Sequence, residues 1–402
     1  MKGIEEKQIE APYELPEGWK WVKQNEVCKL TDGEKLSGIE YPYLEVKYLR
    51  GTKEKVFQSS GKFVIKGTKV ILVDGENSGE VFSVPEDGFM GSTFKALSIQ
   101  NVNEKYLQLF ITTKKDLYRN NKKGSAIPHL NKELFFNMPF PLPPTQDEQQ
   151  RIVNRIESMF DKLDEAKEKA QNVVDGFETR KAAILHKAFT GELTAKWRKE
   201  NGVSDNTWEE KKLGEISKLG SGGTPSKNHP EYYEKGTIPW LKTGEIDWTD
   251  IYEIEEKITE DAIKNSSAKL YPAESVVVAM YGMGVTRGKA GILKIPSTTN
   301  QAVCVLQPNE SLFNRYLFYY FMCNYWEFRE KAVGGNQLNY SATMISNWTI
   351  NLPTLPEQQE VVRILDAVLE KERTAKEAAE NVLEQIDLLK KSILARAFRG
   401  EL

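Results

Sequence analysis

Cysteine and histidine are scarce in this 402-residue sequence, with three residues of each. Cys28, Cys304 and Cys323 are odd in number and lack the spacing of a metal site. We therefore expect reduced, mostly buried thiols, because neither a disulfide framework nor a zinc site fits this pattern.

Long apolar runs are also missing. No uninterrupted apolar stretch approaches the roughly 20 residues that a helix needs to cross a bilayer. Residues 1–10 are acidic and lack the apolar core of a signal peptide. We expect a cytosolic chain that makes no use of a membrane.

The sequence has no excess of basic residues, since 55 Lys and Arg face 58 Asp and Glu for a net charge of −3. A chain that coats nucleic acid indiscriminately would be strongly basic. Any DNA contact must therefore come from local clusters or be shared with a more basic partner.

Catalytic constellations are missing as well. The glycine-rich residues 281–289 do not have the spacing of either common phosphate-binding loop. His129, His186 and His229 are scattered, and neither a catalytic dyad nor a metal cluster can be assembled. We predict a chain without an active site, bound metal or cofactor.

What the sequence does contain is an internal repeat. Residues 144–150 recur as 353–359, and residues 181–193 recur as 390–402, both at an offset of 209. Because the offset holds without a gap between the two matches, each copy is expected to form one rigid element.

Each copy has the features of a long helix. Thr145 with Glu148, and Thr354 with Glu357, have the spacing of a capping box, in which two side chains satisfy free backbone N–H groups. Glycines stand where each helix would end in a left-handed residue, at 191 and 400. About 45 residues of helix would extend roughly 67 Å.

Apolar residues follow a heptad-like spacing along both copies, so we expect the two helices to pack together, antiparallel. Paired alanines near the middle would let them approach closely. The predicted helix–helix seam comprises Ile152, Ile156, Met159, Leu163, Ala166, Ala170, Val173, Phe177 and Ile184 in the first helix, and Val361, Leu365, Val368, Ala375, Ala379, Val382, Ile386, Leu389 and Ile393 in the second.

A β-rich segment of about 140 residues precedes each helix, with short apolar runs separated by Gly, Pro, Asn and Asp. The predicted fold is α+β, with a pseudo-twofold repeat. Its parts are a recognition domain at 1–144, a helix at 145–191, a linker at 192–207, a second recognition domain at 208–353 and a second helix at 354–402. The two globular segments differ in sequence beyond their borders, which suggests two different recognition surfaces on one scaffold.

Acid-poor windows in both segments favour contacts with DNA, although ordinary solvated loops would share the same composition. Lys and Arg suit phosphates, and amides and hydroxyls suit base edges. The candidates in the first segment are Lys47, Arg50, Lys53, Lys55, Asn77, Ser78, Lys122 and Lys123. Those in the second are Thr224, Ser226, Lys227, Lys242, Thr286, Arg287, Lys289, Asn300, Gln301, Asn336, Gln337 and Asn339.

The sequence resembles the specificity subunits of Type I restriction-modification systems over almost its whole length. The matching residues are Leu15-Pro16-Glu17-Gly18-Trp19, Trp208 with Lys212-Leu213-Gly214-Glu215-Ile216, Ser221-Gly222-Gly223-Thr224-Pro225, Ile238-Pro239-Trp240-Leu241, the helix starts Pro-x-x-x-Glu-Gln-Gln at 144 and 353, and the helix ends Ala-Phe-x-Gly-Glu-Leu at 188 and 397.

The resemblance implies two target-recognition domains that each read one half of a bipartite, asymmetric site in double-stranded DNA. It also implies that the helices set the spacer between the halves and dock two methyltransferase subunits, which bind S-adenosylmethionine, with restriction subunits joining through them. A non-enzymatic coiled-coil adaptor between proteins would share the helices and the mild acidity, and remains the alternative.

Overall fold

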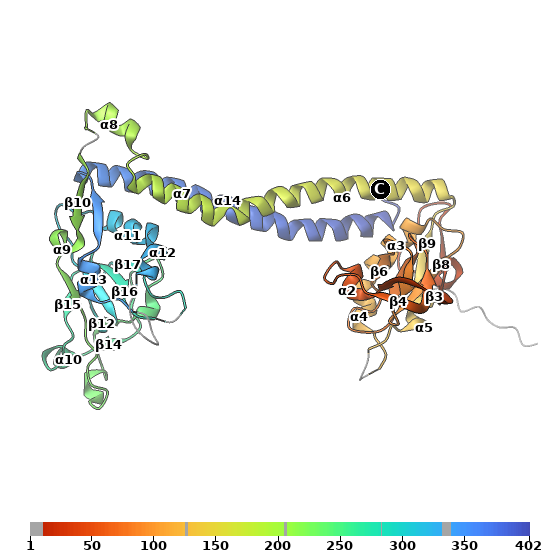
Figure 1. Ribbon diagram of the computed structural model, residues 1–402, viewed down its shortest axis with the longest axis horizontal. Coiled ribbons are helices and arrows are strands. Elements are labelled where there is room, and N and C mark those ends of the chain that lie inside the picture. The colour runs from red at the N-terminus through yellow and green to blue at the C-terminus, as the bar shows by residue number, and fades with distance from the viewer. Residues whose placement is uncertain (1–10, 125–127, 205–206, 283, 332–338) are drawn as a thin grey trace, which may run out of the picture. The chain divides into compact units, whose positions relative to one another are not determined.

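The computed structural model describes residues 11–124, 128–204, 207–282, 284–331 and 339–402. The chain divides into two compact units, one formed by residues 1–171 with 380–402 and the other by residues 172–379 (Figure 1). Helices α6 (Gln146–Asp175) and α14 (Leu355–Ala397) each contribute to both units. Each unit is therefore a globular domain together with one part of each long helix.

The first unit carries a four-stranded sheet of order β2-β8-β5-β6 and a small closed barrel of β3, β4 and β7. Strands β1 and β9 pair separately, next to the start of α6. The elements are β1 (Lys20–Lys23), α1 (Gln24–Val27), β2 (Cys28–Thr31), β3 (Glu34–Leu44), α2 (Val46–Leu49), β4 (Phe57–Val64), β5 (Lys69–Leu72), β6 (Val81–Ser83), β7 (Gly88–Met90), β8 (Phe94–Ile99), α3 (Glu104–Thr113), α4 (Lys115–Asn120), α5 (Lys132–Phe136) and β9 (Pro139–Leu142).

The second unit carries a five-stranded sheet of order β11-β19-β16-β17-β13 and a four-stranded sheet of order β14-β12-β18-β15. Its elements are α7 (Phe177–Phe189), α8 (Ala195–Asn201), β10 (Glu209–Lys212), α9 (Leu213–Ile216), β11 (Leu219–Ser221), η2 (Pro230–Tyr232), β12 (Ile238–Leu241), η3 (Thr243–Glu245), β13 (Asp250–Ile251), β14 (Lys257–Ile258), α10 (Glu260–Lys264), β15 (Leu270–Tyr271), β16 (Val276–Ala279), β17 (Ala290–Leu293), β18 (Ser297–Thr299), β19 (Val303–Leu306), α11 (Asn314–Cys323), α12 (Tyr325–Glu330), α13 (Ala342–Ser346) and β20 (Thr349–Leu352). Helix α8 lies within the predicted linker.

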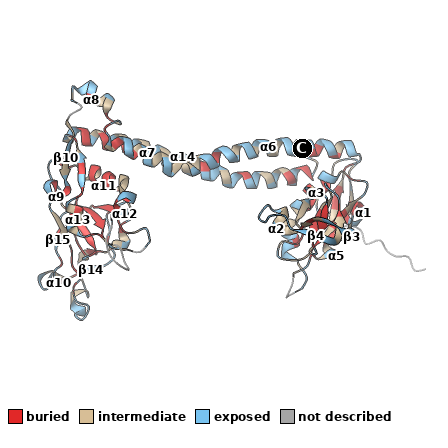
Figure 2. Cartoon of the chain, viewed as in Figure 1, coloured by how far each residue is buried: buried red, intermediate tan, exposed pale blue. Residues whose placement is uncertain are grey.

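Each domain completes its core with the start of one long helix and the end of the other (Figure 2). In the first unit, Phe398 of the α14 end packs on Tyr106 and Phe110, with ring centroids 5.0 and 5.3 Å apart. In the second, Phe189 of the α7 end packs on Tyr316, 5.0 Å away. The repeated Ala-Phe ends are thus core residues of the domains.

The glutamines of the repeated helix starts make the same contact in both units. Gln149 accepts a hydrogen bond from the backbone N–H of Asn103 at 2.7 Å, just before α3. Gln358 accepts one from the N–H of Phe313 at 2.8 Å, just before α11. Both side chains are buried. Each repeated motif therefore ties the start of a long helix to the first turn of the main helix in its domain.

The long helices pack antiparallel within each unit, which confirms the predicted pairing. In the first unit, Asp164 pairs with Lys390 at 2.5 Å, and the Arg151 guanidinium donates to the carbonyl of Leu402. In the second, Arg180 pairs with Glu372 at 2.7 Å. Residue numbers rise along one helix as they fall along the other.

Two details of the helices differ from the sequence prediction. The first copy is interrupted at Gly176, which separates α6 from α7 and lies under the Arg180 side chain. Glu357 does not complete a capping box, because its carboxylate accepts hydrogen bonds from Thr194 and Arg198, both at 2.7 Å. The predicted left-handed ends are present, with φ of +80° at Gly191 and +75° at Gly400.

The seam of α14 also differs at three positions. All nine predicted seam residues of the first helix are buried or half-buried, but Ala375, Val382 and Leu389 are exposed. Their neighbours Lys376, Leu383 and Lys390 are half-buried instead. Lys376, Leu383 and Lys390 keep the seven-residue spacing, and Ala379, Ile386 and Ile393 stay buried or half-buried, so only every second seam position of this part of α14 lies one residue further along the helix.

Among the described residues, no helix combines the length and the apolar character that crossing a membrane requires.

Candidate nucleic-acid interface

In the first unit, the predicted cations surround the loop that joins α2 to β4. Lys47 lies on α2, and Arg50, Lys53 and Lys55 follow it; all four are exposed. Since β3 and β4 pair as a long hairpin, this loop is held at one end of a rigid ribbon.

Most of these cations already have anionic partners. Arg50 pairs with Glu80, Lys53 with Glu45 and Lys55 with Glu86. Lys47, by contrast, has no ion-pair partner among the residues that the structure describes. Phosphates would therefore have to exchange with carboxylates at three of the four positions.

The pKa values of Glu86 and Lys55 also reflect the pairing of these cations with carboxylates. Hydrogen bonds from Lys55 and then from the Tyr48 hydroxyl lower the pKa of the Glu86 carboxyl, and the hydrogen bond to Glu86 raises the pKa of Lys55. The carboxylate is therefore ionised at neutral pH and neutralises the lysine.

The remaining candidates of this unit lie on two neighbouring segments. Lys122 pairs with Glu76, and Lys123 pairs with Glu133 at 3.1 Å. Asn77 is half-buried next to Glu76, whereas Ser78 is fully buried. Because Ser78 is fully buried, its hydroxyl is not accessible to DNA.

Sequence reasoning missed two apolar side chains beside these cations. Val56 and Phe57 are exposed by 44% and 57%, directly after Lys55. An exposed phenyl ring next to cations suits contact with a thymine methyl group or an unstacked base. A hydrophobic residue in a strand is ordinarily buried, so the sequence alone gave no reason to single these out.

In the second unit, several candidates lie at one edge of a sheet, where the parallel strands β12 and β18 end. Strands β12 and β18 run parallel, and Lys242 and Asn300 are the first residues after them. The Asn300 N–H donates to the carbonyl of Leu241 at 3.0 Å. The Thr224 hydroxyl donates to the side-chain oxygen of Gln301. Loops distant in sequence thus converge on this edge.

Not every cation at this edge is available. Lys242 pairs with Glu256 and lies over the Trp240 ring, 5.3 Å from its centroid. Ser226 and Lys227 are exposed, and Lys227 has no ion-pair partner within the described part of the chain. Lys227 is therefore the cation of this edge best placed to meet a phosphate.

The glycine-rich loop leaves the same edge, since the Met280 N–H donates to the carbonyl of Ala302 at 2.8 Å. Arg329 donates to the carbonyls of Gly284 and Arg287, both at 2.6 Å, and so holds the loop by its backbone. The described residues of the loop are therefore anchored by Arg329.

The candidates on this loop are less accessible than predicted. Arg287 is 9% exposed and lies over the Tyr340 ring, and Lys289 pairs with Asp247. Thr286 and Asn339 are half-buried. Asn336 and Gln337 lie outside the described residues.

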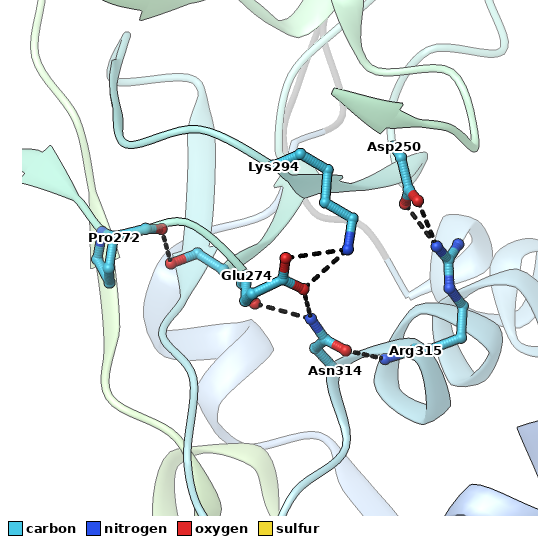
Figure 3. Close-up of polar contacts among 7 residues, drawn as sticks. Asp250, Pro272, Glu274, Lys294, Asn314 and Arg315 are labelled. Atoms are coloured by element: carbon cyan, nitrogen blue, oxygen red, sulfur yellow. Dashed lines mark hydrogen bonds and ion pairs between the residues drawn. The ribbon is translucent and has the colours of Figure 1, made fainter. Parts of the chain in front are cut away.

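A polar cluster fixes helix α11 against the sheet of this domain (Figure 3). Glu274, at a left-handed φ of +65°, accepts hydrogen bonds from Lys294 and from Asn314 at the start of α11. Burial alone would raise the pKa of Glu274, but these hydrogen bonds outweigh it and lower the pKa. Arg315 binds both carboxylate oxygens of Asp250 on β13. These contacts tie the start of α11 to β13 and to the residue two before β16.

The three cysteines are free thiols. Burial raises the pKa of Cys28 and Cys304 to about 12, so neither forms a thiolate at neutral pH. Within the described ranges, no group of three or more His, Cys, Asp or Glu side chains is arranged to hold a metal ion.

Comparison with known proteins identifies related chains. The family model for the Type I restriction modification DNA specificity domain matches residues 16–174 and 205–385. The specificity subunit of the Type I restriction enzyme MjaVIII of Methanocaldococcus jannaschii is 28% identical over 416 residues, which cover 96% of this chain and 94% of that protein. The EcoDI specificity subunit of Escherichia coli is 22% identical over 423 residues, covering 96% of this chain and 89% of that protein.

A solved structure has the same fold. The crystal structure of the HsdS subunit from Thermoanaerobacter tengcongensis matches with a TM-score of 0.68 at 20% sequence identity, covering 98% of this chain and all of that one.

Proposed function

The chain belongs to the family of Type I restriction-modification DNA specificity subunits, and on that premise we propose that each of its globular domains reads one half of a bipartite DNA site. It is the non-catalytic DNA-specificity subunit of a Type I complex, which it forms with other subunits. The proposed readers are the domains within residues 1–144 and 208–353.

One observation carries this proposal. The same glutamine contact anchors both domains to the long helices, yet the main sheets of the two domains differ in strand number and order. A subunit that recognises an asymmetric sequence is expected to attach two different domains to its long helices in the same way.

The balance of charges suggests how specificity and affinity are divided. Because Arg50, Lys53 and Lys55 are already paired with carboxylates, the isolated chain gains little by neutralising phosphates. We infer that other subunits of the complex supply much of the phosphate binding, whereas these domains contribute base contacts.

Individual contacts are testable by electrophoretic mobility shift, with and without the methyltransferase partner. Alanine at Lys47 or Lys227 should weaken binding to all sequences and lower the salt slope by about one unit each. Alanine at Gln301 should relax one base position at a cost of roughly 1–3 kcal/mol. Lys196→Ala is the matched control, since this lysine of α8 is almost fully exposed outside the proposed surface.

Wild-type affinity and salt response in all three variants would remove these residues from the interface. Absence of any sequence-specific shift, even with the partner present, would favour the coiled-coil adaptor instead.

We further propose that the long helices dock two methyltransferase subunits, and that restriction subunits join through them. Val382, Leu388 and Leu389 of α14 are 39%, 66% and 48% exposed, although they are apolar. A group of exposed aliphatic side chains on one helix suits burial against a partner. Leu388→Asp with Leu389→Asp should abolish co-purification of a methyltransferase, while Lys391→Gln on the same helix should not.

A complex that acts on cellular DNA works where that DNA is, so we place the chain in the cytoplasm.

A further inference from the structure

The first unit contains a cavity that the reading of DNA does not explain. It has a volume of about 670 Å³ and lies between the α3–α4 junction, α6 and the last turns of α14. Four aromatic rings line it, from Tyr13, Phe110, Phe160 and Phe398. This volume falls in the range of about 300–1,000 Å³ that is typical of sites for small molecules.

The lining of the cavity is strongly cationic. It contains Lys114, Lys115, Arg119, Lys390, Lys391 and Arg399, but only two carboxylates, Asp116 and Asp387. Lys390 is neutralised by Asp164 at 2.5 Å, and Lys115 approaches Glu80 at 3.7 Å. The other four cations have no ion-pair partner in the described part of the chain.

Among these cations, Lys114 gives the strongest indication that the cavity binds an anion. Its ammonium is half-buried and lies 5.3 Å from the centroid of the Phe110 ring. Burial lowers the pKa of Lys114, and no neighbouring carboxylate offsets this. A cation withdrawn from water without an anionic partner is costly, and the carbonyl ends of α3 and α14 carry only a partial negative charge. An anion in the cavity would supply the missing partner.

The second unit provides an internal comparison. There, a cavity of about 590 Å³ lies against the equivalent part of the helices, where Lys181 and Leu369 correspond to Lys390 and Phe160. Its two arginines are neutralised, Arg315 by Asp250 and Arg373 by Glu370. The excess of unpaired cations is therefore particular to the first unit.

We propose that the cavity of the first unit binds a nucleotide, with its phosphates on Lys114, Lys391 and Arg399 and its base against the half-buried rings of Tyr13 and Phe160. Arginine and lysine bind phosphate oxygens through charge-assisted hydrogen bonds, and aromatic rings accept the flat face of a base. The same chemistry would fit a free nucleoside triphosphate or a nucleotide within a nucleic-acid strand, and the test separates these sources.

The test is isothermal titration calorimetry of the full chain with adenosine 5′-triphosphate and, separately, with a duplex oligonucleotide. Binding of the triphosphate at one site per chain, weakened at least tenfold in Lys114→Ala/Lys391→Ala, would assign the site to free nucleotides. If only the oligonucleotide binds, with the same tenfold loss, the nucleotide belongs to a strand.

Two further variants keep the result interpretable. Lys391→Glu changes an exposed residue of α14, so it tests the site without disturbing the packing around Lys114. Lys181→Ala in the second unit is the matched control and should bind as the wild type does. Absence of binding by both compounds at millimolar concentration, or equal losses in Lys181→Ala and Lys391→Glu, would overturn the proposal and leave the cations as partners of the helix ends alone.

Discussion

At the scale of single residues, the paired glutamines explain why the helix-start motif occurs twice. Gln149 and Gln358 each satisfy a backbone N–H at the start of a domain helix and are themselves buried. Gln358 also donates to the carbonyl of Pro353 at 2.9 Å. An amide side chain accepts and donates hydrogen bonds at the same time, and an apolar side chain can do neither.

Replacing Gln358 by alanine should therefore destabilise the chain. The change leaves the N–H of Phe313 and the carbonyls of Ser311 and Pro353 without this partner, and we expect a loss of about 1–3 kcal/mol in the free energy of unfolding. Gln359→Ala is the control, because the adjacent glutamine of the same motif is exposed. Urea denaturation of the two variants measures the difference; equal stabilities would show that the contact contributes nothing.

Asp32 provides a test of pH dependence at the same scale. Hydrogen bonds from Lys62 and then Lys95 lower its pKa from 3.8 to about 2. Because the folded pKa lies below the unfolded one, the stabilisation is complete above pH of about 4 and is lost as the pH falls through about 2. Resonances of the Asp32 carboxyl followed by NMR should give this low midpoint, and an ordinary midpoint would contradict it.

At the scale of elements, one ion pair stands out in the helix seam. Arg180 of the first copy and Glu372 of the second continue the spacing of the predicted apolar seam, and they bind each other at 2.7 Å. The Arg180 guanidinium also donates to the carbonyl of Val173 at 2.9 Å. A polar pair at one seam position fixes the register of two helices, because any other alignment would leave both groups against apolar side chains.

A double-mutant cycle with Arg180→Leu and Glu372→Leu tests this register pair. Since the side chains are 38% and 24% exposed, we expect a coupling energy of only about 1 kcal/mol. The double variant should be as stable as the wild type in chemical denaturation. Additive effects of the two single changes would show that the charges do not interact.

The sequence predicted the elements that depend on local spacing. The heptad spacing of each helix and the glycine ends at 191 and 400 follow from residues close together in the chain, and the recurrence of this pattern at an offset of 209 indicated that the two helices pair. The sequence prediction was wrong where a residue distant in the chain determines the contact of a side chain. Glu357 has the spacing of a capping residue, but Arg198, 159 residues earlier in the chain, takes its carboxylate.

The same limit applies to the candidate DNA contacts. An acid-poor stretch such as that from Lys47 to Lys55 looks unopposed in sequence, yet Glu80 and Glu86 return from other strands to neutralise it. The burial of Ser78 and Arg287 depends likewise on tertiary packing. Composition alone could therefore point to the regions and not to the accessible side chains.

At the scale of the whole molecule, the proposal makes the paired helices a ruler for the DNA spacer. Insertion of four residues between 167 and 168, together with four between 385 and 386, lengthens both helices at opposed positions. We expect the preferred spacer to change while both half-sites are retained, and methylation mapping of a reconstituted complex would show this. An unchanged spacer would refute the role of the helices in setting it.

The most direct test of two independent readers is the exchange of one of them. Residues 208–353 would be replaced by the corresponding domain of a related specificity subunit, and the methylated adenines made by the reconstituted complex would be mapped on a random DNA library. The account predicts a new sequence in one half of the target, with the other half unchanged. A change in both halves, or in neither, would contradict it.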